Sequence, residues 1–136
     1  MKKMTLALLA TSLFATSALA QAADDLAAIK SAGVMKFGTE GTYAPYTYHD
    51  KSGKLVGFDV DVARAVAEKM GVKPEFVEGR WDGLIAGLSA KRYDAVINQV
   101  GVTDERKAKF DFSQPYIGSK AVLVVRDDNT TIKSFA

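Results

Sequence analysis

The chain has 136 residues, with 18 Lys and Arg against 16 Asp and Glu, a formal net charge of +2 and no cysteine. Without cysteine, neither a disulfide framework nor a lipid-anchoring cysteine after a leader is possible. The basic residues form no stripe with interleaved aromatic residues, so the sequence does not point to a nucleic-acid partner.

Residues 1–20 have the pattern of a secretory signal peptide. Two lysines form the charged start, an apolar run covers residues 6–14, and a small-residue cleavage pattern ends at Ala20. The apolar run is shorter than the roughly 20 residues that a membrane-spanning helix needs. We expect cleavage after Ala20, with Ala22 or Ala23 as alternatives, and a Gram-negative periplasm as the destination, with free secretion as the alternative.

Helical and strand patterns alternate along the rest of the chain. Gly33 and Gly71 are expected to end two of the helices, and Arg64 and Glu68 to form an exposed ion pair. Strands that alternate with helices of this length predict a parallel sheet flanked by helices. The expected elements are a helix over 24–31, a strand over 34–39, a hairpin over 47–56, a helix over 59–70, a strand over 72–77, a helix over 81–90, a strand over 93–100, a short helix over 104–109 and a strand over 120–125.

A candidate carboxylate site lies where an apolar strand leads into the short helix at residues 104–109. Thr103 is a good N-cap, and the two acidic residues after it suit the positive end of the helix dipole. Backbone N–H groups at a helix start attract anions, and the guanidinium of Arg106 fits a carboxylate through two parallel hydrogen bonds. This pattern predicts a site for the α-carboxylate of a free amino acid. The alternative is that Thr103 is only a cap and Arg106 only a solvated side chain.

Ligands of open α/β sheets bind beyond the carboxyl ends of the strands, so residues 39–43, 79–81 and 98–106 are expected to converge. Asn98 and Gln99 break an apolar strand at its end, where a buried amide needs a hydrogen-bond partner. One of these amides is therefore expected to reach a ligand. The alternative is that both bond the adjacent loop.

Three motifs follow one another along the chain: EGTY.P at 40–45, WDG at 81–83 and VINQV…DERK.K.DFS.PY at 96–116. Together they resemble the periplasmic solute-binding proteins that deliver polar amino acids to ABC transporters, and above all the cystine-binding members. The likeness covers residues 26–125. It implies an α/β type II periplasmic-binding-protein fold, with a first lobe over 21–125, the start of a second lobe over 126–136 and truncation before most of that lobe. The residues after position 20 suffice for one small domain but not for two lobes.

The resemblance also implies roles for individual residues. Tyr43 and Trp81 would sandwich the ligand side chain, although both have the alternative of being ordinary core aromatics. Glu40 would help to hold a positive or polar end of the ligand, or would be a surface acid. Gly101 stands where the family often has serine or threonine, so it offers an N–H but no hydroxyl. The full expected set is Glu40, Tyr43, Trp81, Asn98, Gln99, Gly101, Thr103 and Arg106.

The implied function is to bind L-cystine or another polar amino acid as a monomer and to dock on the permease of an inner-membrane ABC transporter. Residues 121–125 resemble the first hinge crossing between the lobes. No catalytic site, cofactor or metal site is expected, since the lone His49 has no second histidine or cysteine beside it. The alternatives are a dehydratase of small carboxylic acids with Glu40 as its acid, and a non-binding fragment. Because the family's partner for the α-ammonium is an aspartate of the second lobe, we expect residues 21–136 to bind weakly or undetectably on their own.

Overall fold

The computed structural model describes residues 25–135, so the predicted signal peptide lies outside the described residues. These residues form two compact units, one that ends at Val100 and one that begins at Gly101. The predicted first lobe, residues 21–125, extends over both units. No helix between residues 25 and 135 is long and apolar enough to cross a membrane.

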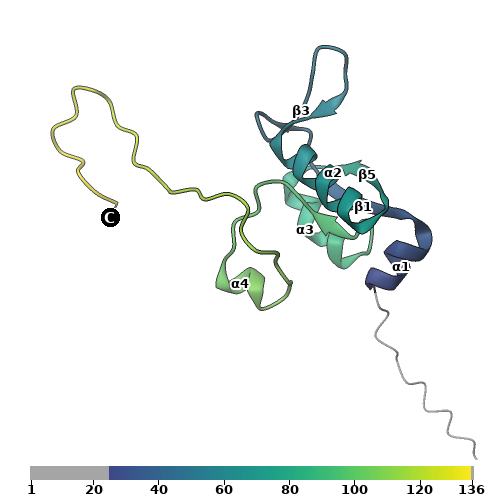
Figure 1. Ribbon diagram of the computed structural model, residues 1–136. Helices are drawn as coiled ribbons and strands as arrows, with labels where there is room; N and C mark the ends of the chain where they lie inside the picture. Colours follow the sequence, from purple (N-terminus) through teal and green to yellow (C-terminus); the bar gives the residue numbers. More distant parts are fainter. Residues whose placement is uncertain (1–24, 136) are drawn as a thin grey trace, which may run out of the picture. The chain divides into compact units, whose positions relative to one another are not determined.

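The first unit is built on a parallel sheet of three strands in the order β5-β1-β6 (Figure 1). These strands are β1 (Val34–Thr39), β5 (Lys73–Glu78) and β6 (Ala95–Val96). The helices of the unit are α1 (Asp25–Ala32), α2 (Phe58–Met70) and α3 (Trp81–Ser89). The arrangement confirms the predicted parallel sheet with flanking helices. It places the carboxyl ends of β1 and β5 next to each other, because their registers run in parallel to Thr39 and Glu78.

The two faces of the sheet are covered by different helices. Phe37 on β1 packs in a core cluster with Ala63 and Ala67 of α2. The next residue, Gly38, lies against the ring of Tyr93, because a Cβ added there would come within 2.6 Å of that ring. Successive residues of a strand point to opposite faces, so α2 and the Tyr93 side chain cover opposite faces of β1.

The Tyr93 side chain joins the sheet to α3. It is buried, and its hydroxyl donates a hydrogen bond to the carbonyl oxygen of Leu84 in that helix. Gly87, one turn further along α3, also leaves room for the Tyr93 ring. Burial raises the pKa of the Tyr93 hydroxyl above its usual value, against the opposing charge of Arg92.

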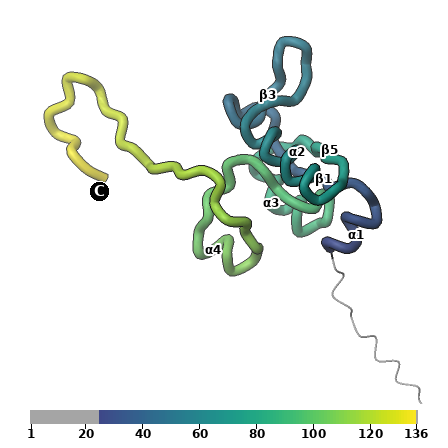
Figure 2. The backbone as a smooth tube through the Cα atoms, in the orientation of Figure 1, coloured from purple at the N-terminus to yellow at the C-terminus, as the bar shows by residue number. Residues whose placement is uncertain are grey.

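A small antiparallel sheet follows β1 and consists of β2 (Thr42–Tyr43), β3 (Thr47–His49) and β4 (Leu55–Val56). It confirms the predicted hairpin, whose loop projects from the first unit in Figure 2. The Asp50 carboxylate closes the turn by accepting bonds from the Ser52 hydroxyl at 2.6 Å and the Lys54 N–H at 3.1 Å. The hydrogen bond from the Ser52 hydroxyl lowers the pKa of Asp50 below its usual value, and the bond from the Lys54 N–H adds to this effect.

Two predicted strands differ in the structure. The strand expected over 93–100 is only the two residues of β6, because the chain beyond Ile97 turns to bond side chains of other elements. The strand expected over 120–125 is absent from the described part of the second unit, where these residues lie extended and Val124 is 85% exposed. A strand needs a partner for its backbone groups, and no strand of residues 25–135 pairs with this apolar run.

Smaller corrections concern the helices. The short helix α4 is Asp104–Lys107, shorter than predicted. The expected ion pair of Arg64 with Glu68 is wrong, since Arg64 pairs instead with Asp61 at 3.1 Å and also donates to the Leu55 carbonyl. Leu26 and Val66, apolar residues of α1 and α2, are exposed. The predicted glycine stops are confirmed, since Gly33 and Gly71 have φ values of 67° and 73°.

Candidate ligand-binding site

Asn98 links the carboxyl ends of β6 and β1. Its side chain is 2% exposed, and its Oδ1 accepts bonds from the Thr39 hydroxyl at 3.0 Å and the Glu40 N–H at 2.9 Å. Its Nδ2 donates to Glu40 Oε2 at 2.9 Å. The buried Thr39 hydroxyl also accepts a bond from the hydroxyl of Thr47 on β3, at 2.8 Å, because its own single proton goes to Asn98. Asn98 is therefore held rigidly at the strand end where sequence reasoning placed it.

Glu40 is the centre of this arrangement. Its second carboxylate oxygen, Oε1, accepts a bond from the backbone N–H of Trp81 at 3.2 Å. Arg80, the residue before α3, provides no side-chain cap, so Glu40 supplies an acceptor for this helix terminus from 41 residues away. One carboxylate thus connects the ends of β1, β5 and β6. Both of its oxygens are engaged within the protein.

Tyr43 and Trp81 present aromatic surface after the ends of β1 and β5. Tyr43 is 48% exposed and Trp81 is 36% exposed, so neither is an ordinary core aromatic. The Tyr43 ring lies 5.2 Å from the ring of Tyr46, tilted by 50°, which supports its orientation from one side. The alternative of buried structural roles for these two residues is therefore wrong.

Gln99 is turned away from solvent toward the start of α2. Its backbone N–H donates to Asp59 Oδ2 at 2.8 Å, and its side-chain Nε2 donates to Asp59 Oδ1 at 2.6 Å. Sequence reasoning had not singled out Asp59. The only available signal was an acidic residue in the first turn of a helix, which in most helices only complements the dipole.

The remaining predicted residues, Gly101, Thr103 and Arg106, lie together in the second unit. The Thr103 hydroxyl accepts a bond from the Arg106 N–H at 3.2 Å, which confirms the predicted N-cap of α4. The guanidinium of Arg106 folds back and donates from Nη1 to the Gly101 carbonyl at 2.8 Å. A Cβ added at Gly101 would still be 3.8 Å from Nη1. These contacts hold the guanidinium against the backbone of the loop that precedes α4.

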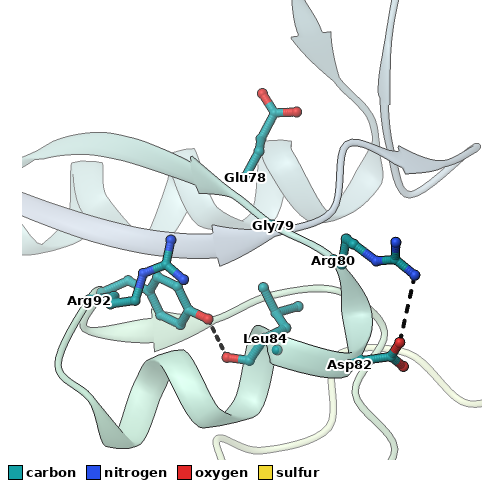
Figure 3. A pocket seen from close by; sticks show the side chains of 8 residues that line it. Glu78, Gly79, Arg80, Asp82, Leu84 and Arg92 are labelled. Atoms are coloured by element: carbon teal, nitrogen blue, oxygen red, sulfur yellow. Dashed lines mark hydrogen bonds and ion pairs between the residues drawn. The ribbon is translucent and has the colours of Figure 1, made fainter.

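A pocket of about 320 Å³ lies between the end of β5 and α3, and Figure 3 shows its lining. Arg80 pairs with Asp82 at 3.9 Å at its edge (Figure 3), and the Tyr93 hydroxyl bonds the Leu84 carbonyl. None of the eight predicted ligand residues lines it. The lining consists of Glu78, Gly79, Arg80, Asp82, Gly83, Leu84, Arg92 and Tyr93.

The lone histidine is used within the fold. His49 Nδ1 lies 3.2 Å from the Gly41 carbonyl oxygen, and its Nε2 lies 3.2 Å from Glu78 Oε1. Within residues 25–135 there is no cluster of three histidine, cysteine or acidic side chains suited to a metal ion.

Residues 35–134 match the model of a family described as bacterial extracellular solute-binding proteins, family 3. The chain belongs to this family. The resemblance found in the sequence motifs is thereby confirmed at the level of the family.

Among the relatives, the L-cystine-binding protein TcyA of Bacillus subtilis is 54% identical over 111 residues, which are 81% of this chain and 41% of that protein. The crystal structure of the L-cystine solute receptor of Neisseria gonorrhoeae, in its unliganded open conformation, is 61% identical with a TM-score of 0.64. The match covers 67% of this chain and 39% of the receptor.

A third match is the arginine-bound form of domain 1 from TmArgBP. It is 39% identical with a TM-score of 0.64, and the match covers 65% of this chain and 71% of that domain. The chain spans about half or less of the length of the curated relatives that it matches. The matches confirm the predicted fold class, a lobe of the type II periplasmic-binding-protein fold. These relatives are named as binding proteins or receptors, which agrees with the prediction that the chain is not an enzyme.

Proposed function

We propose that this chain is the first-lobe part of the substrate-binding component of an amino-acid ABC transporter, with L-cystine as the favoured ligand. The relatives named above as cystine-binding proteins support the choice of ligand, as does the 61% identity to the cystine receptor. The predicted leader supports a periplasmic location. The permease of an inner-membrane transporter is the proposed partner of the complete, monomeric receptor.

The observation that carries the proposal is the double role of Glu40. By bonding both the Asn98 amide and the backbone N–H of Trp81, it ties an amide and the residue that carries a large aromatic side chain to the same strand end. Aromatic faces bury aliphatic and sulfur atoms well, and a thioether or disulfide sulfur interacts favourably with ring edges. A fixed amide donor beside them suits the polar end of the same ligand.

The carboxylate of the ligand is assigned to the second unit. Arg106 carries a permanent charge and a planar set of donors, and Gly101 lets a carboxylate approach its backbone closely. The helix cap at Thr103 and the bond from Nη1 to the Gly101 carbonyl hold this group in one arrangement. The α-ammonium would be held outside these residues, as the family resemblance implies.

The dehydratase alternative has less support. A general acid must offer a proton to the substrate, yet both oxygens of Glu40 accept hydrogen bonds from within the protein. The named relatives are binding proteins. The other alternative is that the chain is a fragment that binds no amino acid. A ligand titration distinguishes this alternative from the proposed function.

The proposal is tested by an NMR titration of residues 21–136 with L-cystine, L-arginine and L-glutamate. We expect weak binding in which L-cystine perturbs the Trp81 indole and Asn98 amide signals most. The structure of TmArgBP domain 1 is described as arginine-bound, so a single lobe of that protein holds a ligand. If none of the three amino acids perturbs these signals at millimolar concentration, this chain is not a ligand-binding part. Sub-micromolar affinity would overturn the expectation that residues 21–136 provide only part of the contacts to the ligand.

A further inference from the structure

We propose that Asp59 is a positioning residue that clamps Gln99 in a left-handed backbone conformation and so fixes the strand end that presents Asn98. Asp59 is fully buried at the start of α2, 40 residues before Gln99 in the chain. A buried carboxylate is unfavourable unless hydrogen bonds satisfy it. Here its two oxygens each accept one bond from the same residue, Gln99.

The conformation of Gln99 explains why a clamp is needed. Its φ is 53°, in the left-handed region that residues with a Cβ adopt only under constraint. The backbone N–H and the side-chain amide are both donors, and an ionised carboxylate is an acceptor only. Two bonds to one carboxylate therefore hold both the backbone and the side chain of this residue.

The clamp is joined to the rest of the candidate site through the backbone. The Asp59 N–H donates to the Tyr46 carbonyl at 2.9 Å, which ties the start of α2 to the segment between β2 and β3. The residue immediately before Gln99 is Asn98, whose amide bonds Glu40. Asp59 thus links α2, the small sheet and the end of β6 at one point.

The clamp of Gln99 by Asp59 determines which of the two amides contacts the ligand. This step rests on the function proposed above. The Gln99 side chain is withdrawn into its bond with Asp59. The Asn98 amide nitrogen carries two hydrogens, of which one goes to Glu40. Of the two amides that sequence reasoning left open, Asn98 is the one that contacts the ligand, and Gln99 acts through its backbone.

The test variant is Asp59→Asn, which keeps the size of the side chain but replaces one acceptor oxygen by a donor. The matched control is Asp61→Asn, which removes an exposed carboxylate two residues along the same helix. We expect amide hydrogen exchange at Gln99 to become about tenfold faster or more in Asp59→Asn and to stay unchanged in Asp61→Asn. L-cystine affinity should fall by a similar factor in Asp59→Asn only.

A rescue variant separates positioning from a general loss of stability. Glycine adopts positive φ without a clamp, so Gln99→Gly in the Asp59→Asn background should restore most of the affinity for L-cystine. Failure of this rescue would mean that Asp59 acts only through the stability of α2, and the proposal would be overturned. If Asp59→Asn does not fold, Gln99→Ala serves instead, because it removes one of the two bonds and should speed exchange at residue 99 by a smaller factor.

Hydrogen exchange also keeps this inference distinct from the proposed function. Unchanged exchange at Gln99 in Asp59→Asn would overturn the clamp, whatever the ligand result. Faster exchange in a protein whose wild-type form binds no amino acid would support the clamp and reject the proposed function.

Discussion

Glu40 and Asn98 bond each other in both directions across the ends of β1 and β6. The Glu40 N–H donates to Asn98 Oδ1, and Asn98 Nδ2 donates to Glu40 Oε2, both at 2.9 Å. The other carboxylate oxygen of Glu40 holds the Trp81 N–H. The pair therefore sets the position of the Asn98 amide relative to the backbone of Trp81, whose aromatic side chain the proposed function needs nearby.

Glu40→Gln tests this relationship. A glutamine has one acceptor oxygen, so either the Asn98 amide or the Trp81 N–H loses its partner. We expect a shift in Trp81 fluorescence and a loss of about tenfold or more in ligand affinity, as for a hydrogen bond to a charged group. Glu75→Gln is the control, since Glu75 forms only an exposed ion pair with Lys36 at 3.9 Å. Equal affinity in the two variants would contradict the role of Glu40.

Arg106→Ala is expected to abolish binding of every amino acid, because all of them carry the α-carboxylate. Arg106→Lys keeps the charge but loses the planar set of donors, so it should recover only part of the affinity. Lys109→Ala removes a neighbouring exposed cation that pairs with Glu105 at 3.9 Å and should bind as the wild type does. Calorimetric titration of each variant with two chemically different amino acids measures these affinities. Unchanged affinity in Arg106→Ala would remove the carboxylate assignment.

Trp81→Ala should change selectivity more than it changes general affinity. The indole offers apolar surface to the ligand side chain, whereas the carboxylate is assigned to Arg106. We expect the preference for L-cystine over L-glutamate to fall by about tenfold or more, since large aromatic anchors contribute strongly to binding. Competition titrations with the two ligands give the ratio. An equal loss for both ligands would show that Trp81 acts through the fold.

Local patterns in the sequence predicted the elements that depend on local interactions. The strand over 34–39 was predicted to the residue, and the Thr103 cap was correct because a cap bonds an N–H only a few positions away. The family motifs drew attention to Glu40, Tyr43, Trp81 and Asn98 before the structure placed them after three neighbouring strands.

Contacts between distant residues were not predictable in the same way. The clamp of Gln99 by Asp59 joins positions 40 residues apart, and nothing near either residue indicates the other. The strand predicted over 120–125 failed for a related reason. Its apolar residues favour a strand, but a strand forms only where a partner offers backbone groups, and local sequence does not report the partner.

Two glycines of α3 give opposite predictions for the same substitution. A Cβ at Gly87 would collide with the hydroxyl and ring of Tyr93, whereas a Cβ at Gly83 would meet nothing within 4 Å. Gly87→Ala should destabilise the protein by about 1–3 kcal/mol, as overpacking does. Gly83→Ala should stabilise it by about 0.5–1 kcal/mol through helix propensity. Urea unfolding measures both, and equal effects would mean that Tyr93 does not pack on α3 as described.

The raised pKa of Tyr93 predicts that the free energy of unfolding falls at alkaline pH. Burial raises the pKa of its hydroxyl in the folded state, so the unfolded chain ionises first, at the usual tyrosine pKa of about 10. The contribution of the neutral hydroxyl is complete below pH 10 and is lost as the pH rises from there toward the folded pKa, because ionisation favours the unfolded state.

Urea unfolding between pH 8 and 11 tests this for wild type and Tyr93→Phe. The variant should be less stable at pH 8, because it lacks the hydrogen bond to the Leu84 carbonyl, but its stability should fall less steeply above pH 10. Tyr48→Phe is the control, since Tyr48 lies on β3 of the small sheet and is only partly buried, and its substitution should leave the alkaline slope unchanged. Parallel pH profiles for wild type and Tyr93→Phe would show that the Tyr93 hydroxyl is not the group whose ionisation unfolds the protein.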